Sequence, residues 1–371
     1  MNLNEKFLCS DGIIRETKPV FLKYLRYNKK FQMWSNDEYE KFQDVTDLCI
    51  FIANAFFNKI GEQDPYVIEF QSKNLHIFDC GLTSESNLTK EKFSESLDKL
   101  HNEYGVPRET INGSLYLSDA RFLIFQIKNC YFEVLSLVSE FYYSLNTESF
   151  CDSDGEIKSS FTINTGYQSN KLHSISNMFF IRIFSLFDYI HKVAFEVTNP
   201  VKHFKSYKRM NSSGVTNSRK IYLKSGINGT LFEESETKIY LRTIRDQIIH
   251  DGFLDEYCQV YKKWSHGKLM EKFILLPDTE NGQFHKCKSR HLFYGRDNKT
   301  NIIILDIMKE ITGRLIKSLK AIIIDLDPIF DVFLDKKNIQ FKCVVEDEKF
   351  YYQIEQKLFI PKKLLPAKFL M

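Results

Sequence analysis

The segment from Ser118 to Ser144 constrains the fold most, because it is the longest part of the chain that reads as one helix. We expect its core-facing side chains to be Phe122, Phe125, Cys130, Phe132, Leu135, Val138 and Tyr142. Aromatic residues make up 15% of the chain, with 33 Phe and 19 Tyr, whereas there are only 15 Gly and 8 Pro. This balance favours a helix-rich globular protein over a barrel or a disordered chain. We interpret the aromatic side chains of this helix as core.

The predicted fold is mainly α and divides into two domains, because 371 residues exceed the usual size of one domain. Residues 1–148 are predicted to be a helical N-terminal domain, and residues 166–325 a helical bundle. The polar stretch 146–160 is the predicted linker. Residues 326–371 are predicted to be a C-terminal extension with short strands.

Local patterns predict the following elements. In the first region we expect helices over Pro19–Tyr27, Asp37–Ile60, Thr89–Tyr104 and Ser118–Ser144, with short extended pieces at Tyr66–Phe70 and Leu75–Phe78. In the second region we expect helices at about 174–198, 236–251 and 299–325, then a hairpin of Ile339–Val345 with Phe350–Ile354.

Several classes of function find no support in the sequence. The eight cysteines are dispersed without metal-ligand spacing, which is typical of reduced cytosolic thiols. No phosphate loop, dinucleotide fingerprint or zinc-protease motif occurs, so we expect no cofactor and no metal. The N-terminus lacks a basic region followed by an apolar run, and the apolar stretches are short. We therefore expect a soluble, cytoplasmic protein without a membrane partner.

The stretch from Ile244 to Gly252 carries the groups with the most chemical potential. Ser235 is a plausible N-cap and Gly252 a plausible end, so a helix of about 236–251 is predicted. On a helical wheel, one sector is apolar and the opposite one polar. The apolar sector contains Tyr240, Leu241, Ile244 and Ile248, and the polar sector contains Arg242, Arg245, Asp246 and His250.

These polar residues could act together on a phosphodiester. Asp246 and His250 are four apart, so the carboxylate could orient the imidazole. Arg245 and His250 are about 7.5 Å apart along the axis and about 140° around it, so they could flank a phosphate. Imidazole transfers protons near neutral pH, and guanidinium stabilises charge on phosphate. The apolar Ile249 within this sector indicates that a second subunit covers the face.

Arg245, Asp246 and His250 resemble the Arg-x4-6-His signature of the HEPN superfamily, whose second position is typically Asn, Asp or His. The helix over 177–197 resembles the long helix that packs against the motif helix in the HEPN four-helix bundle. The resemblance covers about 170–325. It implies a homodimer that cleaves RNA without a metal, with the 2′-hydroxyl of the RNA as the attacking group. It also implies a toxin or phage-defence role, with an antitoxin or another defence-system protein as partner.

The connection between these two helices is strongly basic. From Val197 to Phe232 there is no acidic residue, and aromatic residues are interleaved with the cations. Such a segment is typical of a surface that binds single-stranded RNA. The predicted RNA-binding residues are Lys202, Lys205, Lys208, Arg209, Arg219, Lys220 and Lys224, with Arg242 of the motif helix. A second basic stretch, His285–His291 and on to Lys299, follows the motif.

The resulting hypothesis is a metal-independent endoribonuclease that leaves 2′,3′-cyclic phosphate and 5′-hydroxyl ends. His250 would transfer protons, Arg245 would hold the phosphate and Asp246 would fix the imidazole. One alternative is a non-catalytic helical module for RNA binding or dimerisation, with an ion-paired motif helix. Another is a protein-interaction scaffold without a nucleic-acid partner.

Overall fold

The structure is a computed structural model of the chain. It describes residues 6–63, 67, 70–71, 73–86, 88–150, 160–201, 203–208, 210, 221–326, 341–346 and 349–354. Within these residues the fold is mainly α, as predicted, with small antiparallel sheets at its periphery.

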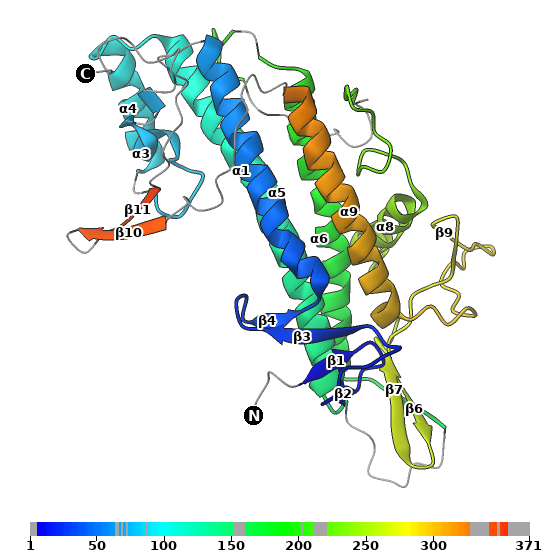
Figure 1. Cartoon of the computed structure of the whole chain (residues 1–371). Coiled ribbons are helices and arrows are strands. Elements are labelled where there is room, and N and C mark those ends of the chain that lie inside the picture. Colours follow the sequence, from blue (N-terminus) through cyan, green and yellow to red (C-terminus); the bar gives the residue numbers. More distant parts are fainter. Residues whose placement is uncertain are drawn as a thin grey trace.

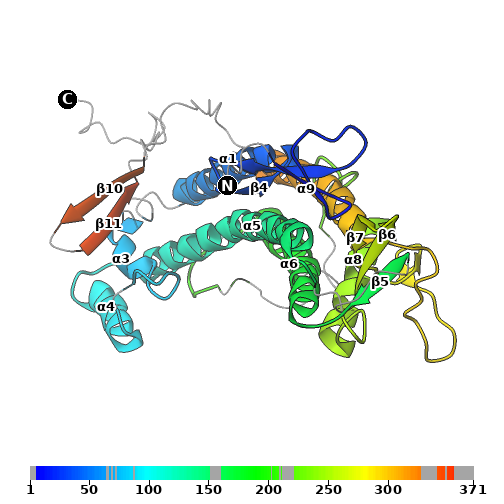
Figure 2. The same cartoon turned by 90° about the horizontal axis from the view of Figure 1, so that it is seen from below.

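Four long helices form the frame of the molecule: α1 (Asp37–Gln63), α5 (Arg108–Thr147), α6 (Tyr167–Thr198) and α9 (Thr300–Leu326). α5 packs between α1 and α6, and α9 packs against both α1 and α6, which closes the bundle (Figures 1 and 2). α5 runs in the direction opposite to the other three. Two of the four helices come from the region before residue 148, so the bundle is not built from residues 166–325 alone.

Local sequence explains where these helices begin. The Asn36 side chain accepts a hydrogen bond from the backbone N–H of Glu38 at 3.1 Å, which confirms the predicted cap of α1. α5 begins after Pro107 and is longer at both ends than the predicted 118–144 helix. α6 begins after Gly166, whose φ of +126° suits a residue without a Cβ.

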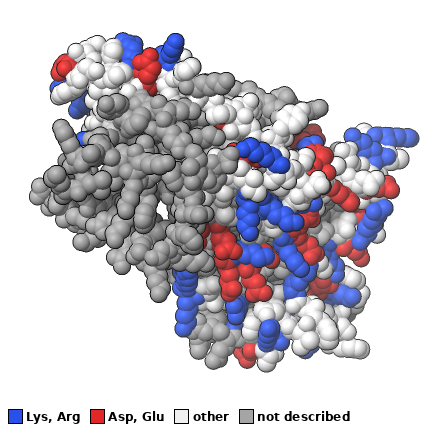
Figure 3. Space-filling model, turned by 45° about the horizontal axis from the view of Figure 1, so that its top comes forward, with Lys and Arg blue, Asp and Glu red and all other residues white. Residues whose placement is uncertain are grey.

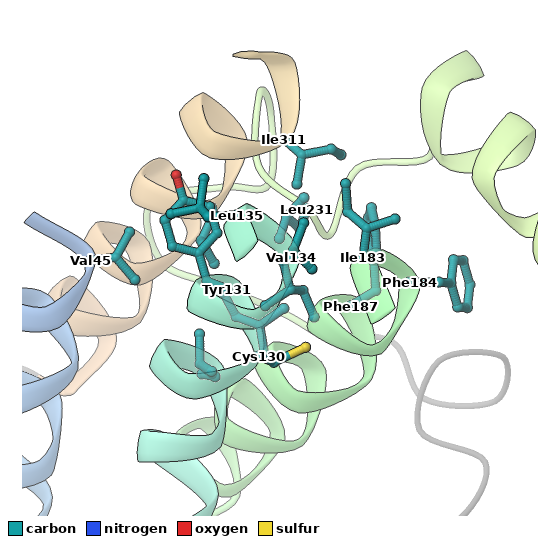
Figure 4. Packing of buried hydrophobic residues seen from close by; sticks show 14 of the residues in the cluster. Val45, Cys130, Tyr131, Val134, Leu135, Ile183, Phe184, Phe187, Leu231 and Ile311 are labelled. Atoms are coloured by element: carbon teal, nitrogen blue, oxygen red, sulfur yellow. The ribbon is translucent and has the colours of Figure 1, made fainter. Parts of the chain in front are cut away.

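One hydrophobic core joins these helices across the stretch expected to link two domains. Its buried residues extend from Leu8 to Leu326 without a break between the predicted domains. Figure 4 shows its centre, where Tyr131 and Val134 of α5 meet Ile183 of α6 and Ile311 of α9. The Tyr131 hydroxyl lies 2.8 Å from Thr312 Oγ1, so the one polar atom of this ring is satisfied inside the core.

A smaller core lies under the first turns of α5. It is formed by Ile77 and Phe78 of α3 (Leu75–Phe78), Leu100 of α4 (Lys90–Asn102) and Ile111 of α5. The predicted helix over 89–104 is confirmed, with Thr89 as its cap. The extended piece predicted at Leu75–Phe78 is wrong, because this segment forms one helical turn that buries Ile77 and Phe78. Most of Tyr66–Phe70 lies outside the described residues.

A four-stranded antiparallel sheet covers the end of the bundle where α1 begins and α5 ends (Figure 1). Its strands, in spatial order, are β2 (Ile14–Arg15), β1 (Phe7–Cys9), β3 (Tyr24–Asn28) and β4 (Met33–Ser35). The helix predicted over Pro19–Tyr27 is therefore wrong. Leu25 is buried and Arg26 is exposed, which is the alternation of a strand with one covered face.

A second sheet packs against the C-terminal end of α5. It contains β5 (Phe161–Asn164), β6 (Val260–Ser265) and β7 (Lys268–Phe273), none of which was predicted. Lys262 Nζ donates to the carbonyls of Ser149 and Phe150, and Lys272 Nζ donates to those of Asn146 and Glu148 at 3.0 and 3.1 Å. These two buried lysines satisfy carbonyls at and beyond the helix end.

Two short hairpins complete the described fold. β8 (Thr279–Glu280) pairs with β9 (Gln283–Phe284), and β10 (Phe341–Glu346) pairs with β11 (Lys349–Ile354). The second pair confirms the hairpin predicted near the C-terminus.

α5 alone among the described helices is long and apolar enough to cross a membrane, and 44% of its apolar window is buried in the fold. Because α5 packs between α1 and α6, its apolar composition is compatible with the core helix of a soluble protein.

Replacing Lys272 should change how stability depends on pH. Burial lowers the pKa of Lys272 to about 8, whereas an unfolded lysine titrates near 10.4. Between these values the unfolded chain binds the extra proton, so the Lys272 contribution to the free energy of unfolding rises with pH. In the parent, the free energy of unfolding by urea should be higher at pH 10 than at pH 8 by on the order of 2 kcal/mol from this residue, and Lys272→Met should lack this increase.

Lys268→Met is the matched control, because Lys268 is exposed on the same strand. Parallel pH dependence of the parent and Lys272→Met would show that Lys272 does not carry the buried titration.

Candidate functional site at the end of helix α8

Helix α8 (Glu236–Asp246) carries the motif and begins where the sequence predicted. Ser235 Oγ accepts a hydrogen bond from the Lys238 backbone N–H at 3.2 Å. After Asp246 the helix continues as a π turn, Gln247–Asp251, and ends at Gly252 with φ of +99°. The predicted 236–251 helix is confirmed in extent, and the π turn is a feature that the sequence pattern did not indicate. Such turns are frequent at functional sites.

α8 packs on the outer side of α6, outside the four-helix frame. Leu241 and Ile244 are fully buried against the core, as the predicted apolar sector requires. Figure 4 shows Phe184 of α6 pointing away from the interior where Val134 and Ile311 meet. The Arg245 guanidinium lies 5.7 Å from the centre of the Phe184 ring, so Arg245 packs over this ring at the edge of the α6–α8 interface.

Ion pairs hold the first turns of α8 in place. Glu234 contacts Lys238 at 3.2 Å and Arg242 at 2.9 Å, and Glu233 contacts Arg314 of α9 at 2.8 Å. Arg242 was predicted to bind RNA, but the structure pairs it with a carboxylate of its own segment. This pairing reduces the charge that Arg242 offers to a phosphate.

Arg245 and His250 both remain at the surface. The Arg245 side chain is 32% exposed and His250 is exposed at the end of the π turn. Neither is enclosed in the apolar core. The His250 imidazole makes no hydrogen bond or ion pair with another described residue.

Asp246 contacts Arg245 and not the imidazole. Its Oδ1 accepts a hydrogen bond from Arg245 Nη1 at 2.7 Å, and no hydrogen bond joins it to His250 among the described contacts. The expected carboxylate–imidazole pair is therefore not formed. The π turn that starts directly after Asp246 links residues five apart, which removes the α-helical stacking of residues four apart on which that expectation relied.

The second basic stretch contacts the motif. His291 Nε2 lies 2.8 Å from Oε1 of Gln247, the buried first residue of the π turn. The Tyr294 hydroxyl donates to the Leu254 carbonyl just beyond the motif. Between β9 and His291 the exposed side chains of Lys286, Lys288 and Arg290 surround a tight turn. The exposed cations of this basic turn, residues 285–291, therefore belong to a segment that contacts the motif through His291.

The described part of the basic connection lies elsewhere. Lys208 pairs with the buried Glu196 at 2.9 Å, and Phe204 packs on Tyr116 of α5. Lys205 is exposed, and the Lys224 backbone N–H donates to Asp325 at the end of α9. Glu196 and Phe184 are twelve residues apart on α6, or about 18 Å along its axis. Lys202, Arg209, Arg219 and Lys220 lie outside the described residues.

Charges of opposite sign are mixed on the face that Figure 3 displays. Lys and Arg side chains alternate with Asp and Glu side chains over its described part, without one continuous basic area. Steering of a polyanion by a broad basic field is therefore not favoured on this face, and local cations carry any such attraction.

Comparisons with protein-family models, with curated protein sequences and with solved structures find no match to this chain. Within the described residues, no group of three or more His, Cys, Asp or Glu side chains is arranged to hold a metal ion.

Sequence reasoning identified the second basic stretch but did not assign His291 to the site. Its position depends on the β8–β9 hairpin, whose turn packs on α8. A Cβ at Gly282 would lie 2.8 Å from both the Glu236 carbonyl oxygen and the Tyr240 backbone nitrogen. A lone glycine in a polar turn was the only signal for this close approach.

Gly282→Ala should displace the hairpin from α8. Gly267→Ala is the matched control. Its φ of +71° is close to the +77° of Gly282, but no atom lies within 4 Å of the position that its Cβ would take. Both variants acquire left-handed backbone strain, and only Gly282→Ala also clashes with backbone. We expect Gly282→Ala to lower the free energy of unfolding by about 1–3 kcal/mol more than the control, measured by urea unfolding. Equal losses would contradict the close packing.

Lowering the pH should destabilise the fold through His191, a buried residue of the helix on which α8 packs. This buried residue of α6 donates its Nδ1–H to the Phe187 carbonyl, and burial, followed by Lys238, lowers its pKa to about 4. An unfolded histidine binds a proton near pH 6.5, so the His191 contribution is complete above pH 6.5 and is lost as pH falls toward 4.

Between pH 7.5 and pH 5 the parent should lose on the order of 2 kcal/mol of unfolding free energy that His191→Asn does not lose. His203→Asn, at an exposed position, should behave as the parent. The same acid slope in all three proteins would refute the assignment.

Proposed function

We propose that the protein is a metal-independent endoribonuclease whose active site lies at the end of α8. The observation that carries the proposal is that Arg245 and His250, five residues apart, both reach the surface where α8 continues into a π turn. The structural alternative is that Arg242, Arg245 and Asp246 form a solvated ion-pair face and that His250 is a cation at the helix C-terminus, where it interacts favourably with the helix dipole. The proposal includes a HEPN-like relationship of α6, α8 and α9, and a cytoplasmic location.

In the proposed reaction the 2′-hydroxyl of RNA attacks the adjacent phosphorus. His250 transfers a proton, and Arg245 stabilises the negative charge that grows on the phosphate oxygens. Asp246 takes a role different from the expected one, because it holds the Arg245 guanidinium instead of the imidazole. The products are a 2′,3′-cyclic phosphate and a 5′-hydroxyl.

The basic turn is the proposed contact for the RNA backbone. Lys286, Lys288 and Arg290 are exposed and belong to the segment that His291 and Tyr294 tie to the motif. Cations beside a scissile phosphate bind the chain without sequence preference. This assigns the RNA contact to residues after the motif, in addition to the exposed Lys205 of the connection.

A homodimer is part of the proposal. Ile249 is 44% exposed, and Phe253 and Tyr257 beyond it are 54% and 61% exposed. Apolar side chains in this number beside a polar motif favour coverage by another chain. A toxin or phage-defence role, with an antitoxin or another defence-system protein as partner, follows from the HEPN resemblance and is proposed on that ground.

Cleavage of total RNA in excess EDTA tests the function. The parent should cut, and Arg245→Ala and His250→Ala should each lower the rate by about 100-fold or more, since each removes a group that acts in the transition state. His76→Ala and Arg26→Ala, which change exposed residues of other elements, are the matched controls. Unchanged cutting by both motif variants, or loss of cutting in EDTA, would refute the proposal.

The ion pairs of Arg242 with Glu234 and of Arg245 with Asp246 favour a second candidate, a non-catalytic RNA-binding module with a structural motif helix. This candidate predicts salt-sensitive RNA binding without turnover. Binding should then weaken when Lys286, Lys288 and Arg290 are all changed to Gln, and should be unaffected by His250→Ala.

A further inference from the structure

A second imidazole reaches the motif from a distant part of the chain. His291 Nε2 lies 2.8 Å from Gln247 Oε1. A carboxamide oxygen only accepts hydrogen bonds, so His291 Nε2 carries the hydrogen and donates it. A neutral His291 ring therefore has its lone pair on Nδ1, which is the tautomer that a proton acceptor at Nδ1 requires.

The ring is held by its surroundings. The Phe284 ring packs against it with 5.7 Å between centroids. Cys287 and Arg290 exchange backbone hydrogen bonds of 2.9 and 3.0 Å, which close the basic turn before His291. After His291, Asp278 accepts hydrogen bonds from the backbone N–H groups of Gly295 and Arg296 at 2.8 and 3.1 Å. A side chain fixed from both sides is preorganised for proton transfer.

Nδ1 of His291 makes no hydrogen bond with any described residue. The side chain is half-buried, and Nδ1 is not among the fully buried polar atoms without a partner in that part of the chain, so this nitrogen is available as an acceptor. Gln247, which holds the opposite nitrogen, shares the π turn with His250. The buried Gln247 carboxamide thus holds the His291 imidazole against the π turn that also contains His250.

We propose that His291 is a second catalytic residue of the site, acting as the general base while His250 acts as the general acid; this inference rests on the proposed ribonuclease function. His291 Nδ1 takes the proton of the 2′-hydroxyl as the 2′-oxygen bonds to phosphorus. The bond from phosphorus to the 5′-oxygen breaks, and protonated His250 gives its proton to that oxygen. One proton enters the protein and one leaves, and exchange with water resets both rings.

Other charged groups also belong to the elements packed around His291. They are Glu236, Lys238, Arg242, Arg245, Asp246, His250 and Asp251 on α8 and the π turn, Glu280 on β8, and Asp278, His285, Lys286, Lys288, Arg290, Arg296 and Asp297 on the segments before and after the β8–β9 hairpin. A pH profile of the parent alone therefore does not identify the base. The base is identified by comparing variants on two substrates that differ in their leaving group.

The test uses one cleavable dinucleotide site in two chemical forms, with oxygen or sulfur bridging to the 5′-carbon. A thiolate leaves without a proton, so the sulfur substrate removes the need for a general acid but not for a base. His291→Gln should lower cleavage of both forms by about 100-fold. His250→Gln should lower cleavage of the oxygen form only.

Two controls separate a catalytic from a structural role. His291→Gln should bind a 2′-O-methyl RNA, which cannot be cut, within about twofold of the parent, since binding does not require proton transfer. Imidazole added to His291→Ala should restore cutting of both substrates. Loss of binding, or no rescue by imidazole, would assign His291 a structural role and overturn the inference.

The remaining outcomes also decide between the two proposals. Cleavage by His291→Gln at the parent rate, or its rescue by the sulfur substrate, would overturn the base assignment and leave the ribonuclease standing. A parent that cuts neither substrate nor total RNA would overturn both.

Discussion

The packing of α5 against α6 is the contact on which the rest of the structure depends. The two helices run antiparallel, with Arg182 of α6 paired with Glu133 and Glu196 hydrogen-bonded to Tyr116 at 2.8 Å. α1 and α9 then cover the remaining apolar faces, and α8 takes the outer side of α6. Because interiors are close-packed, the position of α8 follows from the side chains that α6 presents outward, Phe184 and Phe187 among them.

The candidate site is formed where a helix end meets a loop from another part of the chain. α8 supplies Arg245, and its terminal π turn supplies His250 and Gln247. The segment after β9 supplies His291 and three exposed cations. This segment is held by its own hairpin, by the Asp278 carboxylate and by Tyr294. A site assembled from two elements is stiffer than either alone, because each constrains the rotamers of the other.

The elements that sequence patterns predicted well are the long ones. α1, α4, α5, α6, α8 and α9 were each expected, because apolar residues at helical spacing repeat several times within each. The starts of α5 and α6 lie before the predicted ones, at Arg108 and Tyr167. The strands of residues 7–35 were missed, and β5 was missed because it pairs with β6 about a hundred residues later. A strand of a few residues carries little pattern of its own, and its hydrogen bonds depend on distant partners.

The sequence by itself determined that the chain is helix-rich, that α8 has an apolar and a polar face, and that Arg245, Asp246 and His250 lie at its end. Only the tertiary structure decided that Asp246 pairs with Arg245, that Lys208 of the connection pairs with Glu196 of α6, and that His291 contacts Gln247. Periodicity within a helix is a local property that side-chain spacing records. Which loop packs on that helix depends on how distant segments share one core, and no spacing within either segment records it.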